Sequence, residues 1–172
     1  DKTMTPTLYA QPYDITATGF YFESLEDYTT KAAVNVKEDG QPVEEYDIQF
    51  IDGDDIDCAL AKAFGINQSN IAAYFTAADT WDDHRKRVFI IAVDEVGYDV
   101  NPNTVSPNDF DIDIYELDSL SDLAEHFVDE GLFGDIPDRI APYLDMEAIA
   151  SDLSYDYAQT TIAGTRLIYR AG

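Results

Sequence analysis

The sequence predicts an α+β fold divided into three small units: a sheet with a helix, a helical middle, and a C-terminal mixture of strands with acidic helices. Three observations lead to this prediction. Short runs alternate apolar with polar residues, as strands do, and other runs repeat an apolar residue every three or four positions, as helices do. Glycine, proline and serine residues separate these runs. The predicted units are residues 1–57, 58–102 and 103–172.

The composition predicts a folded protein with an unusually acidic surface. The 172 residues include 35 Asp and Glu against 10 Lys and Arg, a net charge of −25, yet 45% are hydrophobic and 13% are aromatic. A chain that is disordered because of its charge usually has few aromatic residues and low hydrophobicity. A folded chain of this length buries roughly 70% of its unfolded surface, which is enough for one core or several small ones.

The N-terminal unit has the order β-β-α-β, which predicts a small antiparallel sheet with one helix packed on it. Residues 7–11 and 18–22 are rich in aromatic and apolar side chains, as strands are. Ser24 is a suitable N-cap for a helix over residues 25–36. Residues 45–51 alternate apolar with polar side chains and predict the third strand.

The middle unit is predicted to be helical. Apolar residues four positions apart indicate a helix over residues 56–64 that ends at Gly65. A second helix is expected over residues 69–79, with Ser69 as its cap. Residues 81–96 leave two interpretations open, because their β-branched centre fits a strand whereas the acids before it and the glycine after it fit helix ends.

The C-terminal unit begins with the clearest strand pattern in the chain, at residues 109–117. A helix follows over residues 119–130, with one apolar face. Pro137 stands at a position suited to a first helical turn and predicts a further helical region, interrupted near Pro142. Residues 161–170 predict a closing strand.

The sequence contains no recognisable enzyme or metal motif. His84 and His126 lack a partner motif for nucleophilic catalysis, and the single Cys58 excludes an intrachain disulfide and a zinc site built on cysteines. The acidic turn at residues 52–57 departs from the calcium-loop pattern, which requires acids at positions 1, 3 and 5 and glycine at position 6. Carboxylate pairs carry no signal in a chain with 35 acids. We therefore expect no catalytic residue, no metal and no cofactor.

Charge also bears on partners and location. A strongly negative surface repels nucleic acid and attracts proteins that bind nucleic acid. The basic cluster at residues 84–87 is surrounded by acids, so direct nucleic-acid binding is not expected. The longest apolar run, residues 88–93, is far shorter than a membrane span, and residues 1–11 do not resemble a signal peptide. These features predict a cytoplasmic protein without membrane contact.

The acids of the C-terminal unit are distributed unevenly with respect to bases. Residues 109–156 contain 15 acids and one base, whereas an ordinary solvated face would intersperse lysine and arginine. Four acids from Asp118 to Asp129 are spaced by three or four residues, so the helical pattern predicts a stripe with neighbours about 5–6 Å apart, close to the spacing of DNA phosphates. Three more recur every seven residues from Asp138 to Asp152. We interpret these acids as a phosphate-mimicking, partner-binding surface.

The acids predicted to form this surface are Asp109, Asp111, Asp113, Glu116, Asp118, Asp122, Glu125, Asp129, Glu130, Asp135, Asp138, Asp145, Glu147 and Asp152.

Within this unit, the run EGLFGDIPDRIAPYLDMEAIASDL (residues 130–153) resembles the signature segment of the ArdA antirestriction proteins. Weaker similarities include Tyr13 and Gly19 before an aromatic strand, and the acidic strand at residues 44–52. The signature positions that match, apart from acids already named, are Gly134, Ile136, Pro137, Tyr143, Ala148 and Leu153.

The resemblance implies an elongated three-part protein that forms a homodimer through its C-terminal region. It implies mimicry of B-form DNA and occupation of the DNA-binding groove in the methyltransferase core of type I restriction–modification enzymes. It also implies that residues 81–96 are helical, and that the protein is carried by mobile genetic elements. The alternative is an acidic interaction module that inhibits or chaperones another basic, DNA-binding protein.

Overall fold

The computed structural model describes residues 4–172 and confirms the α+β class. Within those residues it contains six α-helices and two three-stranded antiparallel sheets. The chain divides into two compact units, Asp1–Asp109 (unit 1) and Phe110–Gly172 (unit 2), which we describe separately. The further division of unit 1 near residue 57 stays a prediction.

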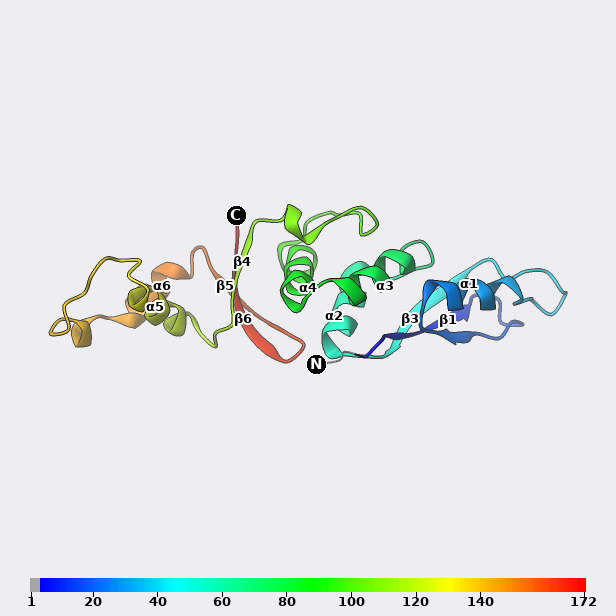
Figure 1. The fold of residues 1–172 in the computed structure, drawn as a ribbon, viewed down its shortest axis with the longest axis horizontal. Helices are drawn as coiled ribbons and strands as arrows, with labels where there is room; N and C mark the ends of the chain where they lie inside the picture. Colours follow the sequence, from blue (N-terminus) through cyan, green and yellow to red (C-terminus); the bar gives the residue numbers. More distant parts are fainter. Residues whose placement is uncertain (1–3) are drawn as a thin grey trace. The chain divides into compact units, whose positions relative to one another are not determined.

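The sheet of unit 1 has the predicted β-β-α-β order (Figure 1). Its strands are β1 (Thr7–Pro12), β2 (Phe20–Phe22) and β3 (Tyr46–Asp52), with β1 in the centre and antiparallel to both neighbours. Helix α1 (Leu25–Ala33) ends three residues earlier than expected. Its Tyr28 ring lies 5.0–6.0 Å from the rings of three aromatic residues of the sheet, Phe20, Phe22 and Tyr46.

Residues 55–96 of unit 1 are mainly helical, as predicted for the middle of the chain. The helices are α2 (Asp55–Phe64), α3 (Ile71–Thr80), α4 (Asp83–Ile90) and a π-helix, η1 (Ile91–Val96), that continues α4.

These bounds decide three expectations. Residues 81–96 are mainly helical, so the strand interpretation is wrong. The N-cap of α3 is Asn70, and Ser69 is wrong as the cap, because its hydroxyl donates to Asn67 Oδ1 (2.6 Å) within the preceding turn. Helix α2 does end at Gly65, which adopts a left-handed φ of 57°.

A buried ion pair lies within this helical part. Lys86 Nζ donates to Asp57 Oδ1 at 2.7 Å, and the side chains are 3% and 1% exposed. The Tyr74 hydroxyl donates to the Asp57 carbonyl oxygen at 2.7 Å. Burial raises the pKa of Asp57, while the hydrogen bond and charge of Lys86 act in the opposite direction. One residue of the basic cluster at 84–87 therefore belongs to the core.

Unit 2 contains β4 (Ile112–Tyr115), α5 (Leu120–Asp129), α6 (Met146–Leu153), β5 (Ala158–Ile162) and β6 (Thr165–Ala171), with strand order β4-β6-β5. Helices α5 and α6 pack against each other (Figure 1). Leu123, Phe127 and Ile168 form the buried core, and residues such as Tyr115 and Leu153 pack around it.

Three expectations for this unit need correction. Residues 161–170 form a hairpin instead of one strand, because Ala163 and Gly164 adopt φ of 51° and 81° and reverse the chain. The first strand is shorter than residues 109–117, since a 3₁₀ turn (η2, Pro107–Asp109) occupies its beginning.

Pro137 does not open an α-helix. A turn follows it, and then a 3₁₀ turn (η3, Ala141–Tyr143) before α6 begins. Pro142 lies inside this 3₁₀ turn, and the chain becomes extended only at Leu144 (φ −69°, ψ 135°), so the turn does not continue into α6.

The ion pair generates a stability prediction. Lys86→Met should lower the free energy of unfolding by about 3–5 kcal/mol, because it leaves a buried carboxylate without its partner. A folded-state pKa raised by burial means that stability falls as pH rises through that pKa. The loss should therefore be larger near about pH 7 than near about pH 5, as measured by urea unfolding.

The matched control is Lys62→Met, which removes an exposed lysine from the same unit. It should change the free energy of unfolding by less than about 1 kcal/mol. Equal losses in the two variants would contradict the structural role of the ion pair.

Candidate acidic binding surface

Unit 2 carries a large excess of negative charge for its size. Residues 110–172 include 14 Asp and Glu against 3 Arg, a net charge of −11. Of the fourteen acids predicted to bind a partner, thirteen belong to unit 2 and Asp109 belongs to unit 1. All of them are exposed except Asp122, which is partly buried. Their carboxylates are thus displayed at the surface, where they can meet a positively charged partner.

Helix α5 separates its acids from its apolar side chains. Leu123, Ala124 and Phe127 are buried. Asp122, Glu125 and Asp129, spaced by three and four residues, share the opposite face. The helix begins after Ser119, whose extended backbone (φ −150°, ψ 162°) forms the N-cap. Asp118 therefore lies outside the helix, and the predicted four-residue helical stripe is reduced to three.

The seven-residue repeat does not form a stripe along one helix either. Of its three acids only Asp152 lies within α6, while Asp145 is the N-cap and Asp138 lies in a turn. All three are exposed, but the helical argument for their alignment is wrong because the helix is shorter than predicted.

Some of the acids also stabilise the local fold. The Asp145 carboxylate accepts from the Ala148 N–H at 3.1 Å and caps α6. Glu147 accepts from the Ser121 hydroxyl at 2.7 Å, which links α6 to α5. Asp109 accepts from the Ser106 N–H at 3.0 Å. The cap could have been recognised from sequence, since aspartate before an apolar helical run is a common N-cap.

The signature residues organise the segment between α5 and α6. Gly134 adopts a φ of 89°, and its N–H donates to the Gly131 carbonyl at 3.0 Å. The Pro137 carbonyl accepts from the Ile140 N–H at 2.9 Å. Leu153 packs against the core of unit 2. The remaining signature residues are the partly buried Ile136 and the exposed Tyr143 and Ala148.

Large apolar side chains are exposed in the same segment. They are Leu132, Phe133, Ile140 and Tyr143, the last of which is 85% exposed. Their exposure could not be predicted from the sequence, because a helical pattern assigns apolar side chains to the buried face. A concentration of exposed apolar side chains within an acidic surface is typical of protein–protein contacts.

Across residues 4–172, no group of three or more His, Cys, Asp or Glu side chains is arranged to hold a metal ion. No helix in the described part of the chain is long and apolar enough to cross a bilayer. His84 and Cys58 are exposed, and His126 is partly buried with its ring 5.9 Å from that of Tyr115.

Two comparisons with known proteins bear on this surface. The family model described as "Antirestriction protein (ArdA)" matches residues 22–166, which is most of the chain and includes the signature segment. A search of curated proteins found no match.

The acidic face of α5 leads to a prediction about stability, for which a second variant in the same helix is the control. Asp129→Asn should stabilise the protein by about 0.3–1 kcal/mol, because a carboxylate at the C-terminal end of a helix opposes the helix dipole. It also removes the repulsion from Glu125 four residues earlier. Asp122→Asn removes the same charge from the first turn, where an acid is favourable, and should bring no gain.

Thermal unfolding of both variants at low ionic strength measures the difference, which should shrink in high salt because exposed charges are screened. Equal melting temperatures for the two variants at low salt would show that the carboxylate at the end of α5 does not destabilise the protein.

Proposed function

The chain belongs to the ArdA antirestriction family, and we propose that it inhibits type I restriction–modification enzymes by mimicking B-form DNA with surface carboxylates. The observation that carries this proposal is the family match over residues 22–166 together with the exposed acids of unit 2. The matched family is described by its antirestriction activity, and we assign the acids a collective role in binding and none in catalysis.

Charge provides the physical basis of the mimicry. Duplex DNA carries about one negative charge per 1.7 Å of axis, so the net charge of −25 corresponds to about 12 base pairs. A groove lined with lysine and arginine that holds phosphates attracts exposed carboxylates in the same way. We propose that the carboxylates occupy the phosphate positions in the DNA-binding groove of the methyltransferase core.

We further propose that the protein acts as a homodimer through unit 2. The exposed Leu132, Phe133, Ile140 and Tyr143 support this assignment, because burying apolar surface is the main favourable term in association. A dimer would double the number of phosphate-like charges presented to the enzyme. Its place of action would be the bacterial cytoplasm, where a mobile genetic element that encodes it enters the cell.

Competition with DNA is the direct functional prediction. The protein should displace duplex DNA from a type I methyltransferase core in a gel-shift assay at about 50 mM salt. Its affinity should fall steeply between about 50 and about 200 mM, as expected when charged surfaces associate. The measurement is the concentration of protein that releases half of the bound DNA at each salt concentration.

An enzyme–DNA complex left intact by excess protein at low salt would contradict DNA mimicry. Recovery of a different basic DNA-binding protein from a restricting host, without any restriction subunit, would instead favour the acidic interaction module.

The dimer generates a separate prediction. Tyr143→Asp should raise the dimer dissociation constant at least about tenfold, which is about 1.4 kcal/mol, by placing a charge among the exposed apolar residues. Sedimentation velocity over a concentration series measures the change. Tyr155→Asp is the control, because Tyr155 has the same side chain, is 86% exposed and lies outside the 132–143 segment. A dimer unaffected by Tyr143→Asp would remove this segment from the interface.

A further inference from the structure

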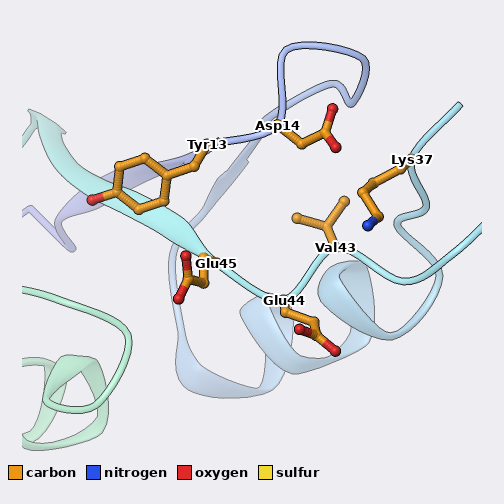
Figure 2. Close-up of a pocket in the computed structure, with 6 residues that line it drawn as sticks. All are labelled: Tyr13, Asp14, Lys37, Val43, Glu44 and Glu45. Atoms are coloured by element: carbon orange, nitrogen blue, oxygen red, sulfur yellow. The ribbon is translucent and has the colours of Figure 1, made fainter.

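Unit 1 has two adjacent hollows where β1 ends and β3 begins. The smaller, of about 170 Å³, is shown in Figure 2 and is lined by Tyr13, Asp14, Lys37, Val43, Glu44 and Glu45. The larger, of about 550 Å³, shares two of these residues and is lined by Tyr13, Glu45, Tyr46, Asn67, Gln68 and Ser69. We call the larger one the Tyr13 groove.

A backbone hydrogen bond places an aromatic ring beside a carboxylate at this groove. The Tyr13 N–H donates to the Glu45 carbonyl at 3.2 Å, so the two residues face each other at the ends of paired strands. In Figure 2 the Tyr13 ring and the Glu45 side chain project to the side of the chain away from Lys37. Tyr13 as a whole residue is 65% exposed, which leaves much of its surface available to a partner.

The opposite wall of the groove is held by its own hydrogen bonds. Gln68 Oε1 accepts from the Tyr46 N–H at 2.9 Å, and its Nε2 donates to the Glu44 carbonyl at 2.9 Å. Asn67 Oδ1 accepts from the Ser69 N–H at 2.8 Å. The side-chain amides of Gln68 and Asn67 are therefore already hydrogen-bonded to backbone groups of the protein. The groups best able to bind a partner are the Tyr13 ring and the Glu45 carboxylate.

An exposed ring next to a carboxylate suits a guanidinium group. Arginine is planar, stacks on aromatic faces and donates two parallel hydrogen bonds to a carboxylate. None of the six residues that line the Tyr13 groove is a base, whereas Lys37 lines the smaller hollow with Asp14. An anionic ligand would meet the negative charge of Glu45 without a compensating cation.

We propose that the Tyr13 groove binds an arginine side chain of a basic protein partner. The proposal rests on the proposed function, because arginines that hold DNA phosphates are the groups such an inhibitor would meet. The attraction between carboxylates and an arginine side chain is, by itself, screened by salt. A ring that stacks on the guanidinium adds a contact that depends on shape and distinguishes arginine from lysine. The groove would thus be an anchor for one partner side chain.

The test is an NMR titration of the isotope-labelled full chain with N-acetyl-arginine amide at physiological salt. The backbone amides of Tyr13, Glu45 and Ser69 should shift and saturate. N-acetyl-lysine amide should bind at least about threefold more weakly, because its compact ammonium cannot stack or form the paired hydrogen bonds. The uncharged citrulline derivative should cause no saturable shift.

Variants assign the binding to the groove. Tyr13→Ala and Glu45→Gln should each weaken binding about five- to tenfold, consistent with the loss of one cation–π or charge-assisted contact. Tyr13→Phe should retain binding, because it keeps the ring. Glu44→Gln is the matched control. It removes the same charge from the neighbouring residue, which lines the smaller hollow and not the Tyr13 groove.

Equal shifts with the arginine and lysine derivatives, shifts without saturation, or unchanged binding by Tyr13→Ala would overturn the proposal. The amide spectrum of each variant reports whether it is folded. The titration needs no restriction enzyme, so its failure is distinguishable from failure of the proposed function, which the competition assay with DNA measures independently.

Discussion

The surface carboxylates of this protein repel one another, and both units must fold against that repulsion. A net charge of −25 on 172 residues opposes compaction, so each unit needs an apolar core that outweighs the repulsion. In unit 1 the rings of Phe64, Trp81 and Phe89 lie 4.9–6.0 Å apart. In unit 2 Leu123 and Phe127 on α5 pack with Ile168 on β6.

The positions of the acids reduce the cost of their repulsion. Nearly all those of the C-terminal surface are exposed, where water and salt moderate their repulsion. The buried acid in unit 1, Asp57, is paired with Lys86, which offsets part of the cost of removing its charge from water. Acids at helix beginnings, such as Asp145, also stabilise the helix that follows. The same side chains can therefore support the fold and supply the charge that our functional proposal requires.

Sequence patterns were sufficient where a residue's environment follows from its spacing. The alternation along β3 and the apolar face of α5 predicted which side chains are buried, and Ser119 marked the start of that helix. Sequence patterns failed where the structure depends on an unusual backbone conformation or on a residue far away along the chain. The left-handed φ of Ala163 is rare for a residue with a Cβ, so the hairpin turn at this position was not predicted. The burial of Lys86 depends on Asp57, 29 residues earlier. Thirteen of the fourteen acids are exposed, as a binding surface requires. Their alignment was predicted wrongly, because the prediction assumed longer helices.

We propose that surface carboxylates occupy the positions of DNA phosphates on a restriction enzyme. A structure of the protein bound to a type I methyltransferase core would locate these carboxylates in the complex. In that complex, carboxylates of unit 2, including Glu125 and Asp129, should lie within hydrogen-bond distance of the lysine and arginine side chains that hold phosphates in the DNA complex. A complex in which these carboxylates face solvent while the DNA-binding groove stays open would contradict this proposal.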